Sequence, residues 1–301
     1  MVKAPPTPKG FRDILPEQAK KRREVINTIV NVLEESGFSP METPTIEFAE
    51  TLKGKYGEEE KLIYEFTDRG DRNLALRYDL TVPLARFVAS NLSLIERGPF
   101  RRYQVGQVFR GEKPQKGRFR EFTQLDFDTV GSNSVEEDSK VIETVAKCLD
   151  ALGLSNYKIL INDRAILNFE NLPLEKGLKV ILSLDKLKKQ GVEKVIDDLG
   201  SIGISKEEAT SMISILEKKK PNERLKQILD AVDNSKVQFS PTLARGLNYY
   251  TGMIFEVEIG DYGISVAGGG RYDNLIGMFT KRQIPAVGAS FGLDRLIEAL
   301  G

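Results

Sequence analysis

The stretch FRRYQVGQVFRGEKPQKGRFREFTQLDFDTV, residues 100–130, decides the fold. Apolar and polar residues alternate over 100–110 and again over 119–130, and the loop GEKPQKGR between them is rich in charge, glycine and proline. Such a pattern is typical of two strands joined by a turn. We therefore predict a long hairpin with a basic tip. Arg110 ends its first strand, and the charged residues around the turn are Glu112, Lys113, Lys116, Arg118 and Arg120.

The second strand of this hairpin carries a row of polar side chains. Because side chains alternate between the two faces of a strand, Gln124, Asp126 and Asp128 share a face with Arg120. A half-buried sheet normally places apolar groups on such a face, so the row suggests the floor of a binding site. An exposed sheet face with solvated ion pairs remains an equal alternative at this point.

Outward from the hairpin, helical and extended patterns follow one another. Helical spacing covers residues 16–37, 79–96, 134–153, 171–236 and a last stretch ending at Gly301, with capping-box matches at Ser134/Glu137 and Ser205/Glu208. Strand patterns cover residues 38–48, LIYEF and NLALRY around the turn TDRGDR, YKILIND, and segments after residue 239. We predict an α+β protein with an antiparallel sheet flanked by helices. Residues 1–170 and 237–301 form its core, and 171–236 form a helical insertion subdomain.

Composition restricts the chemistry available to the chain. The 301 residues have no net charge, so any contact with nucleic acid must come from local basic patches. Histidine is absent, which removes the usual general base and the commonest metal ligand, and we expect no protein metal site. The single Cys148 forms no internal disulfide, and the first residues, MVKAPPTPKG, contain no apolar stretch. We therefore expect a cytoplasmic protein that does not enter a membrane.

Three further segments could carry chemistry. In ARGLNYYTG, residues 244–252, an arginine beside two tyrosines suits an anion next to an aromatic wall, although a turn with packed tyrosines is an alternative. Three consecutive glycines in VAGGGRYDN, residues 266–274, suit a ligand lying against the main chain, or a bulge. Neither the dinucleotide fingerprint nor the phosphate-loop motif is present. Arg295, in AVGASFGLDRL, could project toward the sheet, although an ordinary strand-to-helix turn explains that segment alone.

Taken together and in this order, the segments resemble the class II aminoacyl-tRNA synthetases. The first long helix and the segment around Pro44 resemble motif 1, residues 100–128 resemble motif 2, and VGASFGLDRL resembles motif 3. Arg110 and Arg295 then fall on the two signature arginines. LARGLNYYTG and VAGGGRYDN are similar to the two segments that mark histidyl-tRNA synthetases, and PKGFRDILP and LRYDLTVPLAR fit the same pattern. The resemblance runs from about residue 8 to residue 300.

The resemblance implies a nucleotide site. The substrates would be ATP, with Mg²⁺ on its phosphates, and L-histidine, whose carboxylate attacks the α-phosphate. Arg110 and Arg245 would be the catalytic residues and would hold the α-phosphate from opposite sides, where negative charge develops. Arg295 would lie over the adenine and near the γ-phosphate, and Glu112 would read the adenine amino group.

The resemblance also implies a histidine site and macromolecular partners. Histidine would contact Asp79, Thr81, Gln124, Asp128, Arg245, Tyr249, Tyr250 and Tyr272. Within that set, Asp79, Thr81 and Gln124 would take the α-amino group, and Asp128 and Tyr250 would read the imidazole, with Tyr272 close by. Lys116 and Arg118 would contact the acceptor end of tRNA(His). The Pro44 segment would form a homodimer interface.

Two alternatives to a histidine–tRNA ligase remain. Family members continue past motif 3 into an anticodon-binding domain, which is absent from this sequence ending at Gly301, so either the sequence is a fragment or the protein works without that domain. The regulatory subunit of ATP phosphoribosyltransferase, a non-catalytic paralogue in histidine biosynthesis, also lacks it. Against that reading, the paralogues tend to lose ATP and histidine residues that this chain retains, among them Arg110, Gln124 and Arg245. The second alternative is an interaction module that only binds histidine or RNA.

Overall fold

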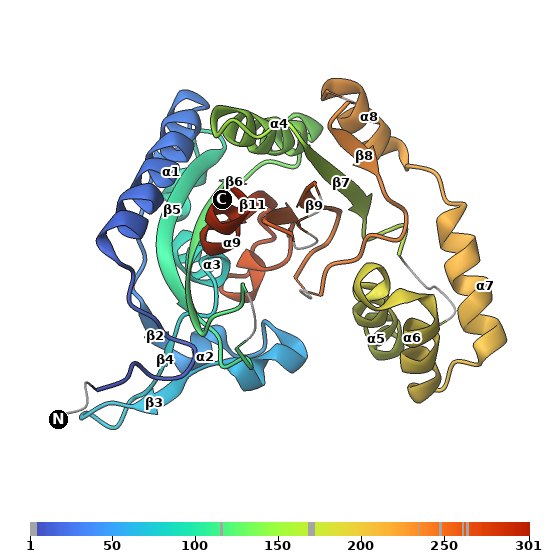
Figure 1. Ribbon diagram of the computed structural model, residues 1–301, viewed down its shortest axis with the longest axis horizontal. Helices are drawn as coiled ribbons and strands as arrows, with labels where there is room; N and C mark the ends of the chain where they lie inside the picture. The colour runs from blue at the N-terminus through green and yellow to red at the C-terminus, as the bar shows by residue number, and fades with distance from the viewer. Residues whose placement is uncertain are drawn as a thin grey trace.

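An eight-stranded sheet organises the molecule (Figure 1). The computed structural model describes residues 5–114, 117–167, 172–233, 235–246, 249–260, 262 and 265–301, without the side chains of residues 58, 174, 188 and 189. The strand order is β1-β5-β6-β11-β10-β9-β7-β8. The strands are β1 (Ser39–Pro40), β5 (Phe100–Phe109), β6 (Glu121–Val130), β7 (Tyr157–Asp163), β8 (Val237–Phe239), β9 (Met253–Ile259), β10 (Ala267–Arg271) and β11 (Ala286–Gly292). β1 and β8 pair parallel with their neighbours, and every other pairing is antiparallel.

The predicted central hairpin is confirmed. β5 and β6 pair without interruption from Phe100 opposite Val130 to Phe109 opposite Glu121. The loop between them begins at Arg110, whose N–H donates to the carbonyl of Arg120. The α+β class and the antiparallel arrangement of the central strands are confirmed as well.

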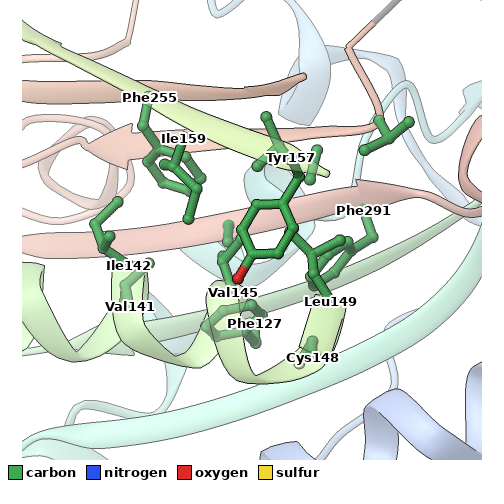
Figure 2. Close-up of a cluster of buried hydrophobic side chains, with 14 of the residues drawn as sticks. Phe127, Val141, Ile142, Val145, Cys148, Leu149, Tyr157, Ile159, Phe255 and Phe291 are labelled. Carbon is green, nitrogen blue, oxygen red and sulfur yellow. The ribbon is translucent and has the colours of Figure 1, made fainter. Parts of the chain in front are cut away.

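One face of the sheet is apolar and is covered by helices. Leu125 and Phe127 on β6 point to this face, as do Phe291 on β11 and Phe255 on β9, and all four are fully buried. They pack against α4 (Val135–Ala151), as Figure 2 shows for Val141, Ile142, Val145 and Leu149. The helices α1 (Pro16–Glu35) and α9 (Leu293–Ala299) complete this cover. The opposite face therefore remains accessible for other side chains.

That opposite face is polar, as the strand alternation predicts. Gln124, Asp126 and Asp128 on β6 lie directly opposite Gly292, Ser290 and Gly288 on β11. On the next strand, Gly268 lies opposite Ser290 and Gly270 lies opposite Gly288. These side chains are buried or nearly so. The alternative of an exposed and solvated sheet face is therefore excluded.

Residues 38–48 form two strands and not one. Pro40 ends β1 at the edge of the large sheet, and β2 (Ile46–Phe48) enters a separate three-stranded sheet of order β2-β4-β3. A proline cannot donate to a strand ladder, which explains the break at Pro40 and Pro44. β3 (Glu65–Thr67) and β4 (Asn73–Leu76) form the predicted hairpin of this sheet. Four short helices accompany it: α2 (Ala49–Leu52), η1 (Gly57–Leu62), α3 (Thr81–Ser90) and η2 (Leu92–Ile95).

The two predicted helix caps differ. Ser205 and Glu208 form the complete capping box at the start of α7 (Lys206–Glu217). At α4, the Ser134 hydroxyl accepts from the Glu136 N–H. The predicted partner Glu137 instead binds Arg101 on β5. The box at α4 is therefore incomplete, because an arginine on the neighbouring strand competes for its glutamate.

Helices dominate the segment between β7 and β8, as its periodicity predicts. They are α5 (Leu174–Leu184), α6 (Leu187–Ser201), α7 and α8 (Glu223–Ala231), and a last short helix, η3 (Ile276–Met278), precedes β11. Leu225 and Ile228 of α8 join the apolar cluster of the large sheet, whereas α5–α7 contribute to the second apolar cluster. No helix in the described parts of the chain combines the length and apolar character needed to cross a bilayer.

Phe127 is the natural test of the apolar face, because it is fully buried and contacts Phe38 edge-on at 5.0 Å between ring centroids. We expect Phe127→Ala to lower the free energy of unfolding by about 3–5 kcal/mol, since it removes a ring and leaves a cavity. Urea unfolding followed by circular dichroism measures this. The control Ile215→Ala, at a side chain 56% exposed on α7, should cost less than about 1 kcal/mol. Equal losses would contradict the assignment of the core.

Candidate active site

A pocket of about 250 Å³ opens on the polar face of the sheet. The described residues that the sequence assigned to a site all line it: Asp79, Thr81, Arg110, Glu112, Arg118, Gln124, Asp128, Arg245, Tyr249, Tyr250, Tyr272 and Arg295. Lys116 lies outside the described residues, as does Asn248 between the two glycines of the 244–252 segment. The structure thus brings together side chains that are up to 216 positions apart, from Asp79 to Arg295.

Arg110 is held between two aromatic rings. Its guanidinium carbon lies 4.3 Å from the centroid of Tyr78 and 5.0 Å from that of Phe122. Its Nε donates to the Tyr78 carbonyl at 3.1 Å. Among the described residues no carboxylate forms a salt bridge with it, and the rings and carbonyl restrict its position. Arg110 is therefore a fixed cation with donors left for an anionic ligand.

Arg245 lies over the glycine strand β10. A Cβ added at Gly268 would be 2.9 Å from Arg245 Nη1, and one at Gly270 would be 3.0 Å from the Tyr250 ring. At Gly288 on β11 the added atom would collide with the Asp128 carboxylate at 1.9 Å. The sequence predicts that a ligand lies against this main chain, whereas the atoms found there belong to side chains of the site itself. The glycines set the depth at which Arg245, Tyr250 and Asp128 lie.

Arg295 reaches the same pocket from the first turn of α9. Its Nε donates to the Gly117 carbonyl at 3.2 Å and its Nη1 to the Ser265 carbonyl at 3.4 Å. Burial, followed by repulsion from Arg118 and Arg110, lowers the pKa of Arg295. Glu112 faces this group and accepts from Arg118 Nη1 at 3.4 Å. Arg110 and Arg118 thus lie near enough to Arg295 to act on its charge, and such a cluster of cations suits phosphate.

Arg120 does not line the pocket, although the hairpin pattern places it in the basic tip. Its Nε donates to the Glu112 carbonyl at 3.0 Å, and its N–H donates to the carbonyl of Gly10 at 2.9 Å. Arg120 therefore holds the loop that carries Glu112 and Arg118 against the N-terminal segment.

The pocket also contains two buried acceptor oxygens that have no donor among the described residues. Asp79 Oδ1 accepts from the Tyr56 hydroxyl at 2.9 Å and from the Val82 N–H at 3.0 Å, whereas its buried Oδ2 has no partner among the described residues. Gln124 Nε2 donates to Ser290 at 2.6 Å, and the buried Oε1 is likewise without a described partner. Burial raises the pKa of Asp79. Buried acceptors of this kind require a donor, so they suit an ammonium group.

An aromatic wall closes the recess beside these acceptors. The rings of Tyr249 and Tyr250 are 5.0 Å apart, and Tyr249 meets Tyr272 edge-on at 6.0 Å. Thr81 forms a side-chain hydrogen bond with Tyr249. The Tyr272 hydroxyl donates to Asp128 Oδ1 at 2.5 Å, and burial raises the pKa of Tyr272, so this donor keeps its proton. The recess therefore has a flat apolar wall and an acidic floor.

Two residues of the floor were assigned no role by sequence reasoning. Arg102 is completely buried, and its Nη2 lies 2.6 Å from Asp128 Oδ2. The contact could have been found from the pairing of the two hairpin strands, because β5 pairs Arg102 with Asp128. Alternation within a single strand does not reveal that pairing. Asp126 belongs to the predicted polar row and lines the pocket with one oxygen that lacks a described partner.

The fold and the site define a class II aminoacyl-tRNA synthetase: a mostly antiparallel sheet, with one arginine from the central hairpin and another from the last helix over its polar face. Residues 10–296 match the family model described as histidyl-tRNA synthetase. The chain therefore belongs to the histidyl-tRNA synthetase family.

Individual relatives agree with this family. The histidine–tRNA ligase of Aeropyrum pernix is 44% identical over 98% of this chain and 74% of its own length. The histidyl-tRNA synthetase of Nostoc sp. PCC 7120 superposes with a TM-score of 0.84 at 30% identity, over 99% of this chain and 76% of that one. A Bacillus halodurans structure, named ATP phosphoribosyltransferase regulatory subunit/histidyl-tRNA synthetase, superposes with a TM-score of 0.80 at 25% identity, over 98% of this chain and 83% of its own.

The glycine at 268 provides a test of the pocket's geometry. We expect Gly268→Ala to weaken ATP binding on the order of 10-fold or more, because the added methyl group meets both Arg245 Nη1 and the Phe255 carbonyl oxygen at 2.9 Å and the arginine side chain must move away. Isothermal titration calorimetry with ATP measures the change. Gly200→Ala in α6 is the matched control, because nothing lies within 4 Å of its added Cβ. Unchanged affinity in a folded Gly268→Ala protein would contradict the position of Arg245.

Proposed function

We propose that this protein activates L-histidine with ATP to form histidyl-adenylate and pyrophosphate, and then transfers histidine to tRNA(His). The observation that carries the proposal is that one pocket holds both arginines and buried acceptors without described donors. Arg110, Arg245 and Arg295 supply the cations, and Asp79 and Gln124 supply the acceptors. An amino acid beside a nucleotide has this distribution of charge, with a phosphate at one end and an ammonium at the other.

The arginines act on the phosphate. The histidine carboxylate attacks the α-phosphorus and pyrophosphate leaves, so negative charge accumulates on oxygens between Arg110 and Arg245. The aromatic contacts of Arg110 and the glycine floor beneath Arg245 hold both cations in place before the reaction. Arg295 covers the adenine and approaches the γ-phosphate, and Glu112 accepts from the adenine amino group. The attacking carboxylate is already ionised, so no protein base is needed.

Histidine meets these acceptors and fills the recess. Its ammonium donates to Asp79 Oδ2 and Gln124 Oε1, which have no other described donor, with Thr81 beside them. The imidazole enters the recess formed by Asp128, Tyr249, Tyr250 and Tyr272. An amino acid without ring N–H groups leaves the acidic floor unpaired, and that cost supplies the selectivity.

Mg²⁺ would arrive with the ATP substrate. The described residues contain no group of three potential ligands that would hold a metal ion. A magnesium ion held by phosphate oxygens and water, with at most one or two carboxylates, fits this donor set. Bound in this way, it would neutralise the leaving pyrophosphate.

Three further features belong to the same proposal. Lys116 and Arg118, in the hairpin loop, contact the tRNA acceptor end, and Arg118 is 44% exposed at its side chain. The segment around Pro44 forms a homodimer interface, supported by Ile46 and Phe48, which are 44% and 51% exposed on β2. Charging tRNA for protein synthesis places the protein in the cytoplasm.

Histidine-dependent exchange of pyrophosphate into ATP tests the activity. We expect robust exchange by the purified chain and a loss of about 100- to 1000-fold in Arg245→Ala, because one of two cations at the reacting phosphate is removed. Arg72→Ala is the control, since this side chain is 64% exposed and pairs only with Asp68 among the described residues. Near-normal exchange in Arg245→Ala would contradict the clamp.

A regulatory subunit of ATP phosphoribosyltransferase is the second candidate, favoured by the name of the Bacillus halodurans structure. The complete set of pocket arginines and acceptors argues for the ligase. The exchange assay separates the two: a folded wild-type protein without exchange would support the regulatory role and reject the ligase.

A further inference from the structure

The N-terminal segment, residues 8–13, lies against the hairpin loop that lines part of the pocket. The Arg120 N–H donates to the Gly10 carbonyl at 2.9 Å, and Arg120 Nη1 donates to the Lys9 carbonyl at 3.3 Å. Gly10 has a φ of +90°, and a Cβ added to it would lie 2.8 Å from two carbons of the Arg120 side chain. The segment therefore crosses the loop at a point where only a glycine fits.

Arg12, in the same segment, contacts two residues that line the pocket. Its guanidinium carbon lies 3.6 Å from the centroid of the Phe119 ring in the hairpin loop. Its Nη2 donates to Asp294 Oδ1 in the first turn of α9. Phe119 and Asp294 both line the pocket, and Asp294 directly precedes Arg295. One side chain thus connects the loop with the helix that carries Arg295.

Asp294 binds donors from three elements outside its own helix. Besides Arg12, Oδ1 accepts from Arg22 Nη1 on α1 at 2.6 Å, and Oδ2 accepts from the Thr123 N–H on β6 at 2.9 Å. The Asp294 side chain is 5% exposed, and the two arginines more than balance its charge. These contacts occupy both carboxylate oxygens, so the neighbouring Arg295 keeps its charge for a ligand.

Resting on the proposed function, we infer that Arg12 is a positioning residue for ATP. It lies outside the pocket and holds the loop through Phe119 and the first turn of α9 through Asp294. Arg295 in turn donates to the Gly117 carbonyl of that loop at 3.2 Å. Movement of the loop relative to the helix would therefore displace Arg295 from the nucleotide. Arg12 fixes the two elements relative to each other before ATP binds.

The kinetics of pyrophosphate exchange test this role. We expect Arg12→Ala to raise the KM for ATP about 5- to 20-fold, with kcat changed less than about 3-fold and the KM for histidine less than about 2-fold. The split is expected because both partners of Arg12 belong to the elements that carry Glu112 and Arg295. Arg12→Lys keeps the charge beside Asp294 but loses the flat contact with Phe119, so its KM for ATP should fall between the other two.

Arg23→Ala is the matched control, because Arg23 is an exposed arginine near the start of α1. Its KM for ATP should equal that of the wild type. A KM for ATP within twofold of wild type in folded Arg12→Ala would overturn the inference. An equal rise in the KM for histidine would also overturn it, since that result would indicate general damage to the pocket. Circular dichroism reports whether each variant folds.

Amide hydrogen–deuterium rates measured by NMR test the same contacts without reference to activity. The Arg120 N–H donates to Gly10 and the Thr123 N–H to Asp294, so both report whether the N-terminal segment holds the loop. We expect both amides to exchange at least about 3-fold faster in Arg12→Ala, while amides at the centre of β6 keep their rates. Unchanged rates at both would overturn the role of Arg12. A wild type inactive in the pyrophosphate assay would instead reject the proposed function, and the amide rates would still decide whether Arg12 positions the loop.

Discussion

The structure depends on burying a strand whose two faces differ in chemistry. From Thr123 to Val130, every residue of β6 is buried, although every second side chain from Gln124 to Asp128 is polar. A buried carboxylate costs several kcal/mol unless another group compensates it. Arg102, Tyr272 and Ser290 supply that compensation from three other strands or their ends. The apolar face holds β6 in place, and the polar face then has a defined geometry at which a ligand can bind.

The same sheet separates two apolar clusters, and the site belongs to the second. Tyr249, Tyr250 and Tyr272 share that cluster with Val180 and Leu184 of α5. A buried ionic cluster connects the glycine-rich strand β10 to helices α4 and α8. Arg271 on β10 and Arg224 on α8 both form salt bridges with Asp138 at the start of α4. Arg271, within the glycine-rich segment, therefore serves to connect elements and does not enter the pocket. The position of Tyr272, next to it in sequence, follows from those contacts.

Much of this could be predicted from the sequence because it is local. The hairpin, its basic tip and the shared face of Gln124, Asp126 and Asp128 follow from alternation and turn composition. The side chains brought together by the resemblance, where described, do line one pocket. The features that could not be predicted from the sequence depend on partners that are distant along the chain. The contact of Arg102 with Asp128 depends on the register of the two strands. The ion pair of Glu137 depends on Arg101 lying beside it on β5, and the break after Pro40 depends on the presence of a second sheet. The glycine run was predicted to lie against a ligand, whereas the side-chain atoms found close to it belong to Arg245 and Tyr250.

The recess for the imidazole is built from carboxylates, tyrosines and arginines, and the 301 residues contain no imidazole of their own. A ribosome that translates this stretch therefore consumes none of the aminoacylated tRNA that a member of this family makes. When the cell runs short of that product, no codon of this stretch requires it. Synthesis of this part of the enzyme is thus insulated from the scarcity it serves to relieve.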